Sequence, residues 1–143
     1  MEKEFILKIK KIGKDVEIPG YNLKSDVGFD LKANEDATLS PGEQKQIKTG
    51  LIAEIPEGCV GLIRDRIGIV TKLGIHTAAG TFDSGFRGEI SIVLVNYADE
   101  TVEIEKGMRI AQMILLPVIK AKIKEVKELN KTERGSKIGI SKK

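Results

Sequence analysis

The chain has 143 residues and a formal net charge of +3, with 41% hydrophobic and 31% charged residues. This composition is typical of one soluble domain with a buried core, and no apolar run reaches the roughly 18 residues that a membrane-spanning helix needs. One cysteine excludes an internal disulfide, and one cysteine with one histidine argues against a His/Cys zinc site.

The charge pattern also limits the partners that we expect. The lysines are scattered among glutamates and only 4% of the residues are aromatic. The sequence therefore lacks the clustered basic face and the stacking side chains of a nucleic-acid binder. The N-terminal segment MEKEFILKIKK lacks the apolar core and cleavage site of a signal peptide. We expect a cytoplasmic protein with no nucleic-acid partner and no membrane partner.

Short apolar runs with strand-like spacing alternate with Gly and Pro turns along the chain. In chain order, the runs cover residues 5–9, 47–55, 59–63, 90–95, 102–104 and 109–118. Cys59 opens the third run, CVGLI, where a lone cysteine is expected to be a small buried hydrophobe. This rhythm predicts an all-β sandwich, jelly roll or barrel.

Two segments depart from the strand rhythm. Apolar residues four apart predict a short helix over residues 66–72. Residues 119–129 are ambiguous, because their apolar positions fit both helical spacing and strand alternation. The end of the chain is polar and contains glycine, so we expect a β domain over residues 1–130 and a flexible Gly/Lys-containing arm over residues 131–143.

Five segments carry a stronger signal together, and in order, than any of them carries alone. They are VGFDLKA (27–33), DRIGIVTKLGI (65–75), GTFDSGFRGEI (80–90), KGMRIAQMI (106–114) and TERGSKIGIS (132–141). They resemble the five ordered motifs of the trimeric deoxyuridine triphosphatase (dUTPase) family, and the third and fourth are the most specific. The resemblance spans nearly the whole chain. It implies a distorted jelly-roll or β-barrel-like sandwich that hydrolyses dUTP to dUMP and pyrophosphate.

The resemblance also implies Mg²⁺ as cofactor and a homotrimer whose sites draw motifs from three chains. Triphosphate oxygens and water would hold the Mg²⁺, which suits its reluctance to dehydrate. Asp30 matches the first-motif acid that lies near the metal's hydration shell, although a strand-end hydrogen bond is an alternative role for it. The C-terminal arm would close over a neighbour's triphosphate, with Arg134 as its phosphate contact.

In the third motif, the resemblance implies that Asp83 is the general base. A carboxylate held within hydrogen-bond reach of a water can orient and deprotonate it for attack on the α-phosphorus. Gly80 and Gly85 would allow the backbone geometry and the close ligand approach that this hairpin needs. Phe86 takes the place of an aromatic, usually Tyr, that lies under the deoxyribose and excludes a 2′-hydroxyl; the alternative is a residue that fills the core.

The second and fourth motifs supply the phosphate contacts. Arg66 and Gln112 match residues of the family that bind phosphate, and a planar guanidinium suits phosphate oxygens. The substrate-binding residues that the resemblance implies are Arg66, Gly68, Thr77, Gly80, Phe86, Gln112 and Arg134.

Three departures from the family pattern put activity and substrate choice in question, but not the fold. Ile67 stands where the second motif normally has a serine that donates to the triphosphate. The segment HTAA (76–79) is about two residues shorter than in some members, so His76 and Thr77 are candidates to line the base pocket, with a structural role favoured for His76. The tail KIGISKK (137–143) lacks the usual phenylalanine that stacks on uracil.

Three other functions remain open at this point. A dCTP deaminase-like enzyme would need a glutamate where this chain has Val93. A related nucleoside triphosphate diphosphatase with shifted base specificity is a second alternative. The third is a catalytically weak member that acts as a nucleotide-binding or regulatory module, which Ile67 and the altered tail favour and the intact Asp83 opposes.

Overall fold

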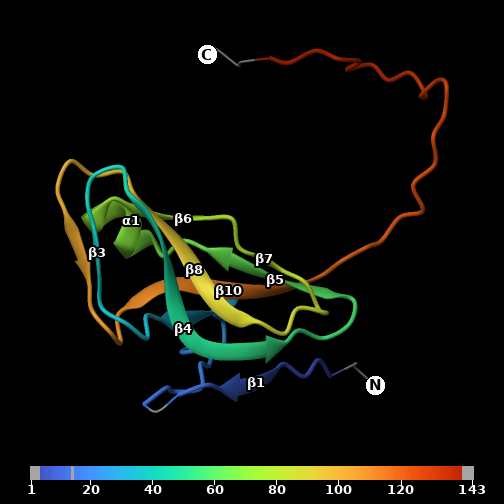
Figure 1. The fold of residues 1–143 in the computed structure, drawn as a ribbon. Coiled ribbons are helices and arrows are strands. Elements are labelled where there is room, and N and C mark those ends of the chain that lie inside the picture. Colours follow the sequence, from blue (N-terminus) through green and yellow to red (C-terminus); the bar gives the residue numbers. More distant parts are fainter. Residues whose placement is uncertain (1–3, 14, 140–143) are drawn as a thin grey trace.

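The computed structural model describes residues 4–13 and 15–139. Over these residues the chain folds into two open four-stranded sheets, a two-stranded sheet and one short helix (Figure 1). This architecture confirms the predicted all-β, jelly-roll-like fold, and its sheets stay open instead of closing into a barrel. Within the described residues, no helix has the length and apolar character needed to cross a membrane.

Every strand pair is antiparallel, and strands that are distant in sequence lie next to each other. The first sheet has the order β1-β4-β8-β6 and contains β1 (Lys8–Lys11), β4 (Gln44–Glu54), β8 (Glu89–Asn96) and β6 (Ile75–Ala78). The second sheet has the order β2-β10-β5-β7 and contains β2 (Gly28–Lys32), β10 (Arg109–Pro117), β5 (Cys59–Arg64) and β7 (Thr81–Phe82). The small sheet pairs β3 (Ala37–Leu39) with β9 (Val102–Ile104).

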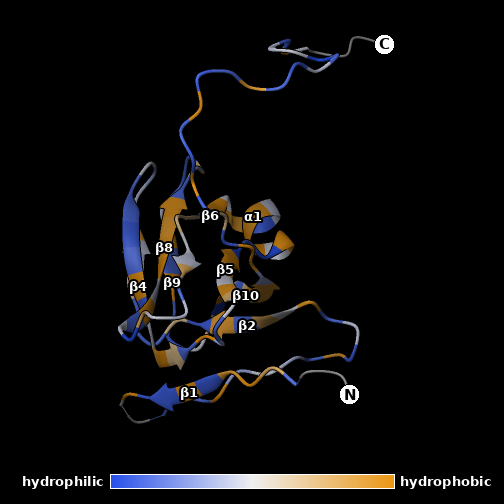
Figure 2. Ribbon diagram, turned by 90° about the vertical axis from the view of Figure 1, so that its right-hand side faces the viewer, coloured by the Kyte–Doolittle hydropathy of each residue, from blue (hydrophilic) through white to orange (hydrophobic). Residues whose placement is uncertain are grey.

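One hydrophobic cluster joins the two large sheets. Buried residues alternate with half-buried residues along β8, as the sequence predicted, and the apolar strands β5, β8 and β10 are prominent in Figure 2. Ile92 from β8 and Met113 from β10 belong to the same cluster and are almost completely buried. Removing each such side chain from water stabilises the fold by about 1.5–3 kcal/mol. Cys59 is also buried in this cluster, which confirms its expected role as a small hydrophobe.

A bulge in β4 sets the position at which β8 begins. The register between the two strands shifts between Lys48 and Ile52. Within the bulge, Gly50 has a φ of +72°, and a Cβ there would lie 2.7 Å from Val16 Cγ2, so this position requires glycine. Its amide donates to Oε1 of Glu89 at 2.9 Å. The bulge therefore anchors the first residue of β8 and, with it, the end of the hairpin that precedes β8.

The predicted helix is present as α1 (Ile67–Leu73), displaced by one residue from the expected range. Arg66 is its N-cap residue, and Gly74 ends it in the left-handed conformation with a φ of +66°. Ile69 is buried in the core, and the partly buried Leu73 packs against the same core. A seven-residue helix is too short to be stable alone, so its position depends on this packing.

The two ends of the chain differ from the sequence-based expectations. The first strand begins at Lys8, and Phe5, which was expected to be part of it, is 54% exposed. The prediction of a helix or strand over residues 119–129 is wrong, because the last regular element ends at Pro117 and the following described residues are exposed coil, turn and bend. This segment leaves the sandwich as a long arm (Figure 1). The predicted tail residues 140–143 lie outside the described residues.

Candidate functional site

A cleft of about 870 Å³ lies between the first residues of β2, the start of α1 and the middle of β10. Four of the predicted site residues line it together: Asp30, Arg66, Gly68 and Gln112. Lys72 adds a second cation to the lining. The cleft therefore combines two cations with an amide, which are the groups that bind a phosphorylated anion.

Asp30 holds the arginine of this cleft in place. Nε of Arg66 lies 2.9 Å from Oδ1 of Asp30, whose side chain is only 17% exposed. A second nitrogen of Arg66 donates to the carbonyl of Arg109 at 3.3 Å. The other oxygen of Asp30 accepts from Asn22 Nδ2 at 3.2 Å and lies 3.8 Å from Nε of Arg109. Asp30 is thus the centre of a charged network that fixes the plane of the Arg66 guanidinium.

Gln112 is positioned by its neighbours in the sheet. Its Cα pairs with Asp30 on one side and with Arg64 on the other. Its side-chain Nε2 donates to the carbonyl of Asp65 at 2.9 Å. A Cβ on Gly28 would lie only 2.6 Å from Gln112 Oε1, so the glycine leaves the space that this amide occupies.

Asp65 supports the cleft from behind and was not among the predicted residues. Its Oδ1 accepts from the amide of Thr77 at 2.6 Å and from the Thr77 hydroxyl at 2.7 Å. Oδ2 lies 3.4 Å from Nδ1 of His76. Burial alone would raise the pKa of Asp65, but the Thr77 hydrogen bonds and His76 hold that pKa below its ordinary value. A single acid before an arginine carries no signal in the sequence, because the partners come from β6.

These contacts also bear on the two candidates from the HTAA segment. His76 contacts Asp65 and packs edge-on against Tyr97 with ring centroids 5.1 Å apart, which agrees with the structural role favoured for it. Both hydrogen-bond donors of Thr77 are engaged by Asp65. A contact between Thr77 and substrate stays a prediction.

The third-motif residues lie on a separate hairpin that begins with β7. Asp83 and Phe86 border a small hollow against the end of β4 and the start of β8. Gly80 has a φ of +102°, and a Cβ there would lie 2.6 Å from Ile63 Cβ, so this glycine allows the hairpin to pack closely on β5. Gly85 is not in a left-handed conformation and has open space around it. The backbone geometry expected of glycine is therefore found at Gly80 but not at Gly85.

One chain does not bring these two groups of residues together. In the β5–β7 pair, Phe82 lies opposite Gly61, so Asp83 is level with Val60. Val60 precedes the end of β5 at Arg64 by four residues, a distance of about 13 Å along a strand. Arg66 lies beyond that end, and Asp83 and Arg66 line different cavities. Arg134, on the arm, donates from Nε to the carbonyl of Lys137 at 3.2 Å.

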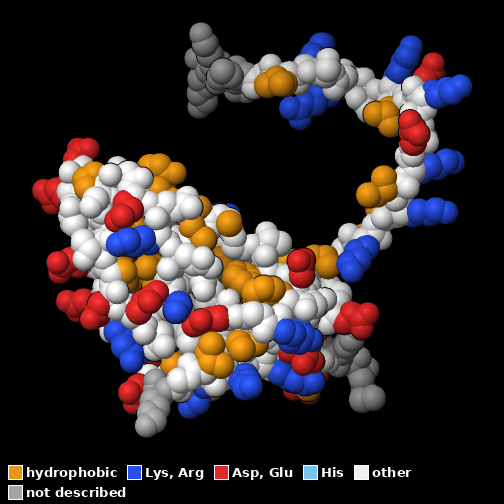
Figure 3. Space-filling view, in the orientation of Figure 1, with side chains coloured by type: hydrophobic (Ala, Val, Ile, Leu, Met, Phe, Trp, Pro, Cys, Tyr) orange, Lys and Arg blue, Asp and Glu red, His pale blue; other side chains and the backbone are white. Residues whose placement is uncertain are grey.

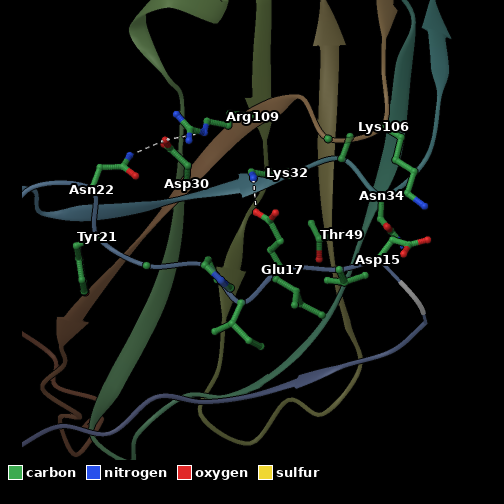
Figure 4. A pocket seen from close by; sticks show the side chains of 17 residues that line it. Asp15, Glu17, Tyr21, Asn22, Asp30, Lys32, Asn34, Thr49, Lys106 and Arg109 are labelled. Atoms are coloured by element: carbon green, nitrogen blue, oxygen red, sulfur yellow. Dashed lines mark hydrogen bonds and ion pairs between the residues drawn. The ribbon is translucent and has the colours of Figure 1, made fainter.

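A second cavity of about 650 Å³ shares a wall with the cleft. Asn22 and Asp30 line both. Figure 4 shows Asp30 between Asn22 and Arg109 on this side, and Lys32 paired with Glu17 at 2.7 Å. The cations of both spaces are matched by carboxylates, so net charge does not distinguish them. The cleft differs in presenting Arg66 and Gln112 together.

The structure places Ile67 at the first position of α1, where its side chain is 82% exposed and lines the cleft. Val27, across the cleft, is also apolar and 71% exposed. The substitution noted in the sequence therefore puts an apolar rim on the cleft that holds Arg66. Val93 lies half-buried on β8, between Gln46 and Ala78.

The comparisons with known proteins agree with these motifs. The model of the dUTPase family matches residues 14–141. A deoxyuridine 5′-triphosphate nucleotidohydrolase of Nautilia profundicola is 48% identical over 132 residues, which cover 91% of this chain and 93% of that protein. The corresponding enzyme of Clostridium tetani is 42% identical over 134 residues, with 92% of each chain covered.

Solved structures of dUTPases are similar to this structure over most of the chain. The dUTPase of Staphylococcus bacteriophage 80alpha with dUPNHPP has a TM-score of 0.86 and 31% identity, covering 92% of this chain and 95% of that chain. The dUTPase of phage phi11 of S. aureus, in a structure that reveals the coordination of a structural Mg(II) ion, has a TM-score of 0.81 and 28% identity, covering 86% and 97%.

Proposed function

The chain belongs to the dUTPase family, and on that premise we propose that it hydrolyses dUTP to dUMP and pyrophosphate, a reaction that removes dUTP from the nucleotide pool and supplies a precursor of dTTP. The observation that carries the proposal is the cleft in which Asp30, Arg66, Gly68 and Gln112 meet. These residues come from three of the five sequence motifs, and the fold gathers them around one anion-binding space.

Asp83 is the proposed general base. Its carboxylate accepts a proton from a water whose oxygen attacks the α-phosphorus of dUTP. The new P–O bond forms as the bond between the α-phosphorus and the bridging oxygen to the β-phosphate breaks, and pyrophosphate leaves. Asp83 is exposed on its hairpin, so a bound nucleotide and a closing partner are needed to exclude bulk water from this step.

The cleft residues bind and orient the triphosphate. Arg66 presents a guanidinium that Asp30 holds at 2.9 Å, so little side-chain freedom is lost when phosphate binds. Gln112, held by the carbonyl of Asp65, supplies an amide for a phosphate oxygen. Lys72 contributes charge to the same cleft. Each charge-assisted hydrogen bond to phosphate contributes about 1.5–3 kcal/mol.

Mg²⁺ fits this site as an ion held mainly by the substrate. The described residues contain no group of three or more His, Cys, Asp or Glu side chains that could hold a metal by themselves. Asp30 has a carboxylate oxygen whose contacts are long, at 3.2 Å and 3.8 Å, and it would hold the ion through a coordinated water. When bound, the ion would neutralise negative charge on the triphosphate oxygens.

A homotrimer is the proposed assembly. The separation of Asp83 from Arg66 along β5 supports it, because a complete site then needs residues from different chains. The arm supports it as well: Ile119 and Ile123 are 98% and 96% exposed, and Figure 3 shows apolar and lysine side chains along a segment without contact to the sandwich. When a second chain covers apolar residues exposed in this way, their burial stabilises the association of the two chains. The proposed role of Arg134 is to carry the arm's phosphate contact into a neighbour's site.

A weak enzyme that mainly binds nucleotide is the second candidate. The observation that favours it is the exposed Ile67 at the cleft, since an isoleucine cannot donate a hydrogen bond to phosphate. A diphosphatase with another base preference is tested by the same experiment.

The test is product analysis by chromatography after incubation of the full chain with dUTP, dCTP, dTTP or UTP and Mg²⁺. We expect dUMP and pyrophosphate from dUTP and much slower turnover of the others. Asp83→Asn should lower the rate by about a hundredfold or more while a non-hydrolysable dUTP analogue still binds. Tight binding of dUTP without turnover by the unmodified chain would instead identify a binding module.

A further inference from the structure

The turn that carries Asp83 and Phe86 is held by few contacts of its own. The amide of Phe86 donates to the carbonyl of Asp83 at 3.1 Å, which closes a β-turn over residues 83–86. Asp83 is exposed, and the side chain of Phe86 is 44% exposed. A turn in this position would sample several conformations unless another group fixed its backbone.

Arg87 supplies that group. Its Nη1 donates to the carbonyl of Ser84 at 2.7 Å and to the carbonyl of Phe86 at 3.0 Å. One guanidinium nitrogen therefore bridges two carbonyls of the same turn. Nη2 of Arg87 lies 3.7 Å from Oε2 of Glu54, at the end of β4. The guanidinium thus ties the turn to the sheet beside it.

The ring of Phe86 depends on the same arrangement. A Cβ on Gly88 would lie 2.5 Å from Cζ of Phe86, so the ring lies directly over this glycine. Phe82 packs edge-on against the same ring, with ring centroids 5.6 Å apart and an interplanar angle of 61°. Because Arg87 binds the carbonyl of Phe86, it also fixes the point from which this ring projects.

We propose that Arg87 is a positioning residue that fixes the turn bearing Asp83 and Phe86, and so sets both the hydrolysis rate and the preference for deoxyribose. This role rests on the proposed function, in which Asp83 is the base and Phe86 lies under the sugar. Catalysis is sensitive to such positioning, since a displacement of about 1 Å can cost roughly a hundredfold in rate. An exposed ion pair such as Arg87–Glu54 contributes little by itself, so the two carbonyl contacts carry the effect.

The experiment compares Arg87→Met, Arg87→Lys and Lys8→Met in the full chain. Lys8 is the matched control, because its Nζ pairs with the same Glu54 at 3.0 Å without contacting the turn. We expect Arg87→Met to lower kcat for dUTP about ten- to a hundredfold and to lower the ratio of kcat/KM for dUTP over UTP. Arg87→Lys should retain most of the defect, because the lysine side chain is one atom shorter and its ammonium does not reach the position from which Nη1 of Arg87 contacts both carbonyls. Lys8→Met should match the unmodified protein.

Hydrogen exchange of the Phe86 amide without nucleotide gives a readout that does not depend on the reaction. We expect faster exchange in both Arg87 variants and unchanged exchange in Lys8→Met. The inference is overturned if the Arg87 variants have the same Phe86 amide exchange, hydrolysis rate and sugar selectivity as the unmodified protein. It is also overturned if their Tm is lower while amide exchange and selectivity are unchanged. If Arg87→Met does not fold, Arg87→Lys decides by the same criteria. If the unmodified chain does not hydrolyse dUTP, the proposed function fails, and the exchange measurement still decides whether Arg87 holds the turn.

Discussion

The substitution Asp30→Asn distinguishes two roles of the Asp30 carboxylate: orienting the Arg66 guanidinium, and holding the hydration shell of Mg²⁺. Asparagine keeps the size of the side chain and one acceptor oxygen, but it removes the charge that lies 2.9 Å from Arg66 Nε. A hydrogen bond between charged groups contributes about 1.5–3 kcal/mol. If that free energy keeps Arg66 aimed at phosphate, its loss lowers kcat/KM for dUTP by about ten- to over a hundredfold.

An opposing effect of the same substitution is smaller. Removing a negative charge makes the cleft more positive, which favours an anion. A phosphate oxygen about 7 Å away would gain roughly 1 kcal/mol at the effective dielectric constant of about 20 near a protein surface and at physiological ionic strength. The loss of orientation should therefore exceed the gain in potential, and the net effect should be weaker binding and slower turnover.

The assay is steady-state hydrolysis of dUTP over a range of Mg²⁺ concentrations, together with the affinity for a non-hydrolysable analogue. Asp26→Asn is the matched control, because Asp26 lines the same cleft but its Oδ2 accepts from the amide of Leu23 at 2.9 Å and not from Arg66. An Asp30→Asn protein with unchanged kcat/KM would refute the orientation role. A higher Mg²⁺ requirement with unchanged analogue affinity would assign Asp30 to the metal's hydration shell instead.

Three further predictions concern stability and the altered second motif. In a denaturant titration, Gly80→Ala should lower the free energy of unfolding by about 2–5 kcal/mol, since the φ of +102° and the 2.6 Å approach to Ile63 both disfavour a side chain. The control Gly85→Ala should change that free energy little, because nothing lies within 4 Å of a Cβ at this position. Ile67→Ser should raise kcat/KM by about tenfold or more if the hydroxyl donates to phosphate, and a decrease would mean that the cleft works with an apolar rim. Because the pKa of Asp65 is lowered from 3.8, its carboxylate contributes stability that is present above that value and is lost as the pH falls through the lower folded pKa. The Tm of Asp65→Asn should therefore decrease less than that of the unmodified chain as the pH falls below about 3.8, and equal decreases would contradict the reasoning.

The strands of the core could be predicted from the sequence because burial imposes a period of two. The alternation from Ile90 to Val95 and the single buried face of α1 are local patterns, and the structure confirms both. The arm shows where this reasoning fails. Residues 119–129 have the apolar spacing of a regular element, but the segment is exposed and leaves the sandwich. Exposed apolar side chains do not hold a helix or strand in place.

The site residues that lie in sequence motifs could be predicted, whereas the contacts between distant segments could not. Motif resemblance identified Arg66 and Gln112, and the structure places both in one cleft. The supporting contacts of Asp65 and Arg87 could not be predicted, because their partners are set by strand register and by the course of a turn. Thr77 meets Asp65 only because β6 lies beside the end of β5, and sequence spacing does not record that distance.

Asp83 directly follows β7, about 13 Å along β5 from the end that leads to Arg66, and this separation affects how the enzyme behaves on dilution. In the proposed assembly no chain completes a site from its own residues, so only the associated trimer is active. Below the concentration at which chains associate, turnover per chain falls even when dUTP is saturating, and the rate rises more steeply than chain concentration. For the same reason, chains inactivated at Asp83 and chains inactivated at Arg66 would complement each other when mixed, since some of their shared sites contain both intact residues.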